Sequence, residues 1–192
     1  MRQARVLTDP EFKRLLAVVA QRKHAARDRV ALILSHLAGL RVGEIAGLIL
    51  RDVFETNGDV REQLRVRADI AKGGHERVVF MSDRLRKEIE RYRDAVPGMG
   101  NRDAEEPLLM TQKRTAFSPN TLCQLMAQLY RATGLDGATS HSGRRWFITR
   151  LAHAGTSPKV IMTLAGHRHL TTTQRYIDVR DDMLRAAVEM LS

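Results

Sequence analysis

Apolar residues recur at helical spacing along most of this chain of 192 residues. In residues 25–38, for example, apolar side chains three and four positions apart fall on one face, as in a helix that packs on a core. Thr8 and Pro10 mark another helix start, because they supply a capping hydroxyl and a proline in the first turn. The pattern predicts helices over residues 9–23, 25–38, 42–48, 82–95, 119–133, 141–154, 157–165, 171–177 and 181–191.

The period changes over residues 63–70, where apolar and polar residues alternate. Alternation is typical of a half-buried strand, because successive side chains point to opposite faces. A turn at residues 72–74 leads to a second strand over residues 76–81. An earlier turn at residues 56–59 joins a further short strand, residues 50–54, to the same sheet. The sequence predicts an α+β fold that is mostly helical and contains one small antiparallel sheet.

Composition indicates one domain. Hydrophobic residues make up 43% of the chain, which is enough for one core, and no linker divides it, so we expect a single domain over residues 1–192. No stretch approaches the ~20 continuous apolar residues of a membrane helix, and charged residues interrupt any signal-like run in residues 1–20. We therefore expect no membrane partner and a cytoplasmic location. The single cysteine, Cys123, excludes an intramolecular disulfide and a cysteine metal cluster.

The charge of the chain favours a polyanionic partner. Its 32 basic and 22 acidic residues give a net charge of +10. Arginine outnumbers lysine, and guanidinium groups bind phosphate in a bidentate manner. An acidic protein or an anionic membrane surface would satisfy the charge alone, so the choice of nucleic acid depends on the motifs.

Three short segments stand out because they contain arginine, histidine and tyrosine residues at regular positions. Residues 38–45 read Ala-Gly-Leu-Arg-Val-Gly-Glu-Ile, and residues 141–144 read His-Ser-Gly-Arg. Residues 164–167 read Leu-Ala-Gly-His, and Tyr176 follows nine residues after His167.

In order and spacing these segments resemble the catalytic domain of tyrosine recombinases, the phage integrase family, over about residues 5–190. That family carries an arginine in Gly-Leu-Arg-x-x-Glu, a lysine in a β-hairpin, a His-x-x-Arg box, a Gly-His and a tyrosine nine residues later. The resemblance implies double-stranded DNA as the substrate and a supporting role for Glu44, which orients Arg41 or a neighbour. It implies six catalytic residues, which are Arg41, Lys72, His141, Arg144, His167 and Tyr176.

The chemistry of strand cleavage agrees with these roles. Breaking a phosphodiester without a metal requires a nucleophile, charge stabilisation at phosphorus and a proton for the leaving oxygen. Tyr176 can attack and hold the phosphate covalently, while Arg41 and Arg144 can clamp its two non-bridging oxygens.

Three residues remain for proton transfer. Lys72 can protonate the leaving 5′-oxygen, His141 can accept the tyrosine proton and His167 can donate to a phosphate oxygen. Because the phosphotyrosine stores the bond energy, we expect no ATP, metal or other cofactor.

The chain departs from the family pattern in two ways. The box usually has leucine before its arginine and histidine or threonine after it, whereas Gly143, Arg145 and Trp146 surround Arg144 here. Most members also carry a helical DNA-clamp domain before the catalytic one. We expect none here, which would make the chain an excised fragment or a small stand-alone recombinase.

Residues 119–133 predict a DNA-reading helix, since the family places the corresponding helix in the major groove. Asparagine and glutamine can read adenine, and arginine can read guanine or phosphate. The polar stripe comprises Asn120, Gln124, Gln128 and Arg131, and Lys113 and Arg114 lie just upstream as candidate phosphate contacts. An ordinary solvated helix face is the alternative. The amphipathic helix at 181–191 packs either on its own core or, as often in the family, on a neighbouring protomer, which would favour a homotetramer on DNA.

Other functions remain open. A tyrosine-type relaxing topoisomerase would use the same residues without sequence choice. A metal-dependent nickase would use His167 and His169 beside Tyr176, although those enzymes place the histidine pair on a strand. A DNA-binding protein without catalysis is disfavoured because every catalytic position is filled. Taken alone, Lys72 could be an ordinary solvated lysine in a turn, and Tyr176 an ordinary half-buried tyrosine. The prediction therefore depends on all six catalytic positions being filled in the family order.

Overall fold

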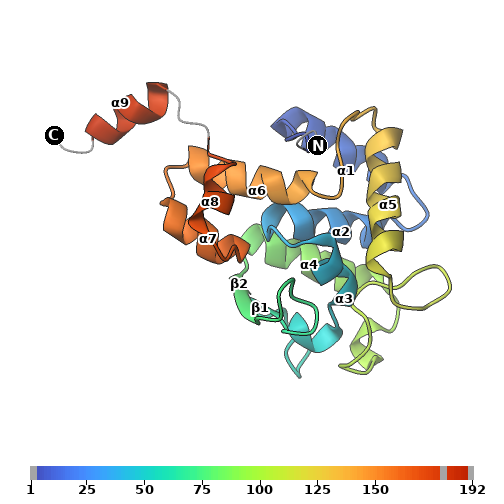
Figure 1. The fold of residues 1–192 in the computed structure, drawn as a ribbon. Helices are drawn as coiled ribbons and strands as arrows, with labels where there is room; N and C mark the ends of the chain where they lie inside the picture. Colours follow the sequence, from blue (N-terminus) through green and yellow to red (C-terminus); the bar gives the residue numbers. More distant parts are fainter. Residues whose placement is uncertain (1–3, 178–180, 190–192) are drawn as a thin grey trace.

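The computed structural model describes residues 4–177 and 181–189 (Figure 1). Its helices are α1 (Asp9–Ala20), α2 (Ala25–Leu37), α3 (Val42–Gly47), α4 (Asp83–Ala95), α5 (Pro119–Ala132), α6 (Ser142–His153), α7 (Pro158–Ala165), α8 (Leu170–Gln174) and α9 (Asp181–Glu189). The 3-10 turns are η1 (Leu50–Asp52) and η2 (Met99–Asn101), and the strands are β1 (Gln63–Val66) and β2 (Arg77–Phe80). The predicted class, mostly helical with a small antiparallel sheet, is confirmed.

Helix α2 lies at the centre of the main core, with α1, α4 and α6 packed against it (Figure 1). Every residue from Val30 to His36 is buried, more than the single face that the sequence predicts, because neighbouring helices cover several sides. A second, smaller cluster joins α6 to α7 and includes Ile148 and Ile161, with Tyr176 packed against its edge. The two cores therefore meet at α6.

The hairpin follows the predicted alternation. Leu64 pairs with Val79 in the antiparallel register, and both are buried. On the outer face Val78 and Phe80 are 47% and 65% exposed. The strands are shorter than predicted, because the chain turns at Arg67, whose carbonyl accepts hydrogen bonds from the backbone N–H groups of residues 70 and 71.

The predicted strand at residues 50–54 is wrong, since residues 50–52 form the 3-10 turn η1. The Asp52 carboxylate caps this turn by accepting a hydrogen bond (3.0 Å) from the Ile49 N–H, and it also pairs with Arg67. A side chain that bonds to nearby backbone competes with sheet pairing. Only an isolated bridge between Phe54 and Val60 remains of the expected strand.

Helix boundaries at the C-terminal end matter for the site. Helix α8 ends at Gln174, so Tyr176 lies just beyond it rather than within a helix over 171–177. Helix α9 lies apart from the body in Figure 1, and Leu184 and Val188 on it are exposed. In the described part of the chain, no helix has both the length and the apolarity to cross a membrane.

Candidate active site

Arg41 and Arg144 approach each other from different elements. Arg41 precedes α3, and its guanidinium donates to Glu44 Oε1 (2.8 Å) and to the carbonyl of Gly166 (3.3 Å). Arg144, in the first turn of α6, is 5% exposed and donates to the carbonyls of Gly39 (2.6 Å) and Ala165. Both guanidiniums are thus anchored on the segment that ends α7.

Gly39 allows α6 to come close enough for this anchoring. Its φ of +63° lies in the left-handed region, and a Cβ there would lie 2.5 Å from the Phe147 ring. Glycine therefore provides both the turn after α2 and the space for Phe147, which shares α6 with Arg144.

His167 and Tyr176 form the other half of the site. Helix α7 ends at Gly166 with a φ of +62°, and the chain then places His167 so that its Nδ1 lies 2.9 Å from the Thr173 hydroxyl. The rings of His167 and Tyr176 stack with centroids 5.9 Å apart. The Arg145 guanidinium lies 5.9 Å from the tyrosine ring centroid, so both a histidine ring and a cation are neighbours of the Tyr176 ring.

The site is electrostatically poised for an anion. Burial, reinforced by Arg144, Arg41 and Arg77, lowers the pKa of His167 to about 4, so its imidazole is neutral near pH 7. Burial, together with Arg41, lowers the pKa of Arg144 to about 9. Clustered cations with too few counter-charges favour binding of phosphate.

Lys72 and His141 are both exposed to solvent. Lys72 lies in the hairpin turn, and the carbonyl of the next residue, Gly73, accepts a 2.6 Å hydrogen bond from Arg168. Because Arg168 follows His167, this bond ties the hairpin turn to the site. His141 lies immediately before α6, three residues from Arg144, with its backbone N–H bound to Thr139.

Glu44 has a partner that the sequence did not predict. Arg77, the first residue of β2, donates from both terminal nitrogens to the two oxygens of Glu44, at 2.8 Å each. Burial alone would raise the pKa of Glu44, but the hydrogen bonds and charges of Arg77 and Arg41 lower it below its usual value. The hairpin register was the available signal, because Arg77 pairs with buried Val66 and so occupies a position facing inward.

The candidate DNA-reading stripe on α5 is open to solvent. Asn120, Gln124, Gln128 and Arg131 are all exposed. Lys113 and Arg114 are also exposed, in the turn before α5, with Arg114 at a φ of +59°. Their contact with DNA stays a prediction.

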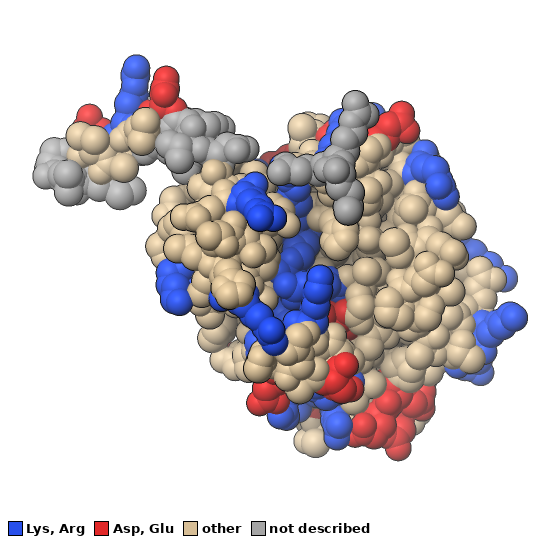
Figure 2. Space-filling model, in the orientation of Figure 1, with Lys and Arg blue, Asp and Glu red and all other residues tan. Residues whose placement is uncertain are grey.

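Figure 2 shows Lys and Arg side chains gathered in a hollow in the middle of this face, between α7–α8 and α5. Acidic side chains gather along the lower margin instead. The basic hollow suits a polyanion better than the mixed margin does.

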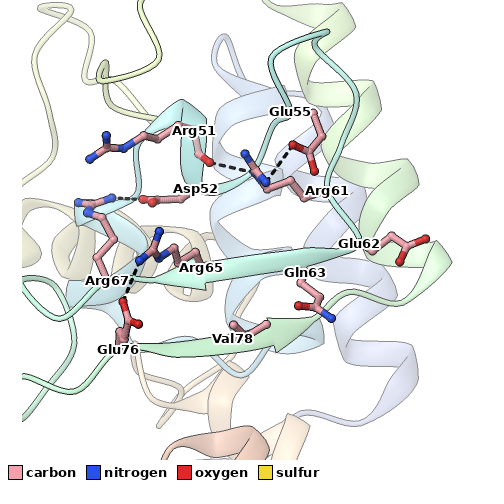
Figure 3. Close-up of a pocket in the computed structure, with 10 residues that line it drawn as sticks. All are labelled: Arg51, Asp52, Glu55, Arg61, Glu62, Gln63, Arg65, Arg67, Glu76 and Val78. Carbon is pink, nitrogen blue, oxygen red and sulfur yellow. Dashed lines mark hydrogen bonds and ion pairs between the residues drawn. The ribbon is translucent and has the colours of Figure 1, made fainter.

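A separate groove, of about 690 Å³, lies beside the outer face of the hairpin (Figure 3). Its lining contains four arginines and four carboxylates. Arg61 pairs with Glu55, Arg65 with Glu76 and Arg67 with Asp52. Because its charges balance and most are paired, this groove is a weaker phosphate site than the hollow.

His167 and His169 both lie in the turn between α7 and α8, so the strand geometry expected of the nickase is not met. Over the described residues, no group of three or more His, Cys, Asp or Glu side chains is arranged to hold a metal ion.

Solved structures identify the class of fold. A crystal structure of XerA recombinase matches 99% of this chain and 64% of its own, with a TM-score of 0.75 and 24% identity. The Tn1549 transposon integrase in complex with a circular intermediate DNA matches 99% of this chain and 67% of its own, with a TM-score of 0.77 and 19% identity. The fold is that of the tyrosine recombinase catalytic domain.

The sequence adds the family. The phage integrase family model matches residues 5–183. Tyrosine recombinase XerA of Pyrococcus horikoshii is 35% identical over 188 residues, which are 95% of this chain and 60% of the relative. XerC of Rhodospirillum centenum is 35% identical over 164 residues, 85% of this chain and 46% of the relative. The chain belongs to the phage integrase family, and it spans only about half the length of these relatives.

Proposed function

We propose that this chain is the catalytic domain of a site-specific tyrosine recombinase, which cleaves and rejoins double-stranded DNA through a 3′-phosphotyrosine. The proposal rests mainly on one observation, which is that four side chains come together around the end of α7: Arg41, Arg144, His167 and Tyr176. Family membership supports the proposal, as do relatives named tyrosine recombinases.

In the proposed reaction, the Tyr176 oxygen attacks the scissile phosphorus. A bond forms between phosphorus and the tyrosine oxygen, while the bond to the 5′-oxygen breaks. His141 takes the phenolic proton, and Lys72 gives a proton to the departing 5′-oxygen. Rejoining runs the same steps in reverse with a new 5′-hydroxyl. The number of phosphoester bonds is unchanged, so no ATP is consumed.

The cations act on the phosphate itself. Arg41 and Arg144 stabilise the negative charge that builds on the non-bridging oxygens. His167, neutral in the free protein, can donate through Nε2 in the tautomer whose Nδ1 accepts from the Thr173 hydroxyl. The negative charge of a bound phosphate offsets the repulsion between the positive charges of Arg41 and Arg144.

Beyond the site, the proposal assigns the exposed α5 stripe to the major groove and Lys113 and Arg114 to the phosphate backbone. Strand exchange between two duplexes needs four cleavages, which favours a homotetramer on DNA. The exposed apolar positions Leu184 and Val188 of α9 suit docking on a neighbouring protomer. We also propose that residues 1–192 form one domain. We propose that the protein acts on DNA in the cytoplasm.

The test is incubation with nicked suicide DNA, followed by a denaturing gel. The wild-type chain should form a covalent adduct, and Tyr176→Phe should bind DNA without forming one. Tyr130→Phe is the matched control, because the Tyr130 hydroxyl is buried without a hydrogen-bond partner among the described residues. An adduct at the wild-type level in Tyr176→Phe would overturn the assignment.

The same purified protein distinguishes the three alternative functions. A relaxing topoisomerase would remove supercoils from plasmids of any sequence, and loss of activity in EDTA would indicate a metal-dependent nickase. Sequence-selective binding with no adduct on any substrate would indicate a non-catalytic DNA-binding protein.

A further inference from the structure

Arg77 has contacts that its position in a strand does not require. An arginine at the start of a two-stranded sheet can reach solvent along its long side chain. Here the side chain turns inward, with 14% of its surface exposed, and donates hydrogen bonds to both oxygens of Glu44. Its Nε is buried and has no hydrogen-bond partner among the described residues.

The same side chain packs against the turn that precedes His167. A Cβ at Gly166 would lie 2.7 Å from Arg77 Cδ and 2.8 Å from its Nε. The Gly166 carbonyl in turn accepts a hydrogen bond from Arg41. Arg77 therefore contacts α3 and the end of α7 from the hairpin that carries Lys72.

Glu44 is the shared partner in this arrangement. Its Oε1 accepts from both Arg41 and Arg77, while its Oε2 accepts from Arg77 and from the backbone N–H of Arg41. If a nearly fully buried carboxylate had a single arginine partner, that arginine would donate to both carboxylate oxygens in a bidentate pair. With Arg77 as the bidentate partner, Arg41 gives Glu44 only one terminal nitrogen, and its other terminal nitrogen donates to the Gly166 carbonyl. The remaining N–H groups of the Arg41 guanidinium are then available to a phosphate.

We propose that Arg77 is a positioning residue of strand cleavage: by holding Glu44, it sets the orientation of Arg41 toward the scissile phosphate and fixes the hairpin to the site. This inference rests on the proposed function. It differs from a purely electrostatic role, in which any cation at this position would serve.

The experiment measures single-turnover adduct formation on saturating nicked suicide DNA. Arg77→Met should slow cleavage by about 10²-fold, the scale of misplacing a reacting group by ~1 Å. Arg77→Lys keeps the charge but cannot form the bidentate contact, so it should also slow cleavage, by about 10-fold. DNA affinity should change by no more than about threefold in either variant. Arg65→Met is the control, because Arg65 is an exposed arginine of the same hairpin that pairs with Glu76.

A double-mutant cycle locates the effect. If Arg77 acts through Glu44, then Arg77→Lys should change the rate by less than about twofold in a Glu44→Gln background, since coupled residues are non-additive. The His167 ring provides a second readout by NMR. Arg77→Met removes a nearby cation and should raise the pKa of His167, whereas Arg77→Lys should leave it nearly unchanged.

Three results would overturn the inference. They are a wild-type rate in Arg77→Met, a wild-type rate in Arg77→Lys, which would indicate charge alone, and full additivity with Glu44→Gln. If Arg77→Met fails to fold, the cleavage rate of Arg77→Lys and its double-mutant cycle with Glu44→Gln test the inference. Failure of the proposed function looks different, because the wild-type chain itself would then form no adduct.

Discussion

The Thr173 hydroxyl lies 2.9 Å from Nδ1 of His167, and Thr173 is fully buried. When the hydroxyl donates to Nδ1, the ring proton lies on Nε2, from which it can be donated to a phosphate. The two partners are six positions apart in the chain, and α8 brings Thr173 to the histidine. The tautomer of a proposed catalytic histidine thus depends on a threonine outside the catalytic set.

Removal of this hydroxyl should impair cleavage without loss of DNA binding. Thr173→Val should slow single-turnover adduct formation by about 3–10-fold, equivalent to ~0.5–1.5 kcal/mol for one hydrogen bond. Nitrogen NMR should show a mixed His167 tautomer. Thr172→Val, a change one position away in the same helix, should have a smaller effect. A unique Nε2–H tautomer and wild-type cleavage in Thr173→Val would refute the role.

Gly143 is required by packing, although it departs from the family pattern. A Cβ there would lie 2.4 Å from Ser35 Oγ and 2.7 Å from Nδ1 of His36, both on the buried α2. Gly143→Ala should therefore lower the free energy of unfolding by about 1–3 kcal/mol, the usual cost of overpacking. Gly100→Ala is the control, since nothing lies within 4 Å of its Cβ position. Equal thermal midpoints for the two variants would contradict this explanation.

The sequence predicted most of the helices and the hairpin because their patterns are local. The motifs also named residues that the fold brings together, such as Arg41 and Arg144, although they lie far apart in the chain. Arg77 was missed because its role depends on Glu44, which lies 33 residues earlier, and no local pattern records that contact. The expected strand at 50–54 failed for a similar reason, since the Asp52 side chain engages the backbone and the distant Arg67.

His36 should make the fold sensitive to acid. Burial between Phe12 and Trp146 lowers the pKa of His36 to about 4, below the ~6.5 of an unfolded histidine. A depressed folded-state pKa contributes stability that is present above pH ~6.5 and is lost as the pH falls toward 4, where the unfolded chain binds the proton more readily. The loss should be roughly 3 kcal/mol for this group.

Urea unfolding between pH 7 and pH 4 measures this loss. His36→Leu should flatten the pH dependence, while His153→Gln, at an exposed histidine of α6, should leave it unchanged. An unchanged slope in His36→Leu would show that other groups govern acid unfolding.

Gln124 should contribute to sequence preference. It is exposed in the middle of the α5 stripe, where its amide can pair with an adenine edge. Gln124→Ala should relax discrimination at one base pair by ~1–3 kcal/mol in competition binding. Gln63→Ala, at an exposed glutamine of β1, should leave discrimination intact. Uniform weakening across all sequences would instead assign Gln124 to the phosphate backbone.

Lys72 should act as the general acid. Cleavage expels a 5′-oxygen whose alkoxide leaves poorly, so a positioned proton donor should accelerate the step by ~10²–10⁴-fold. Arg41 and Arg144 are poorer candidates, because hydrogen bonds to Glu44 and to backbone carbonyls already hold both guanidiniums in place. Lys72 is exposed in a turn followed by two glycines at positive φ, and the Gly73–Arg168 hydrogen bond keeps this turn beside the site.

Replacing the bridging 5′-oxygen with sulfur tests this role, because a thiolate leaves without protonation. Lys72→Ala should cleave normal DNA slowly and recover much of its rate on the sulfur substrate. Lys87→Ala, at an exposed lysine of α4, should match the wild type on both substrates. If Lys72→Ala is equally slow on both, Lys72 acts through charge or positioning, and His141 becomes the next candidate for the acid.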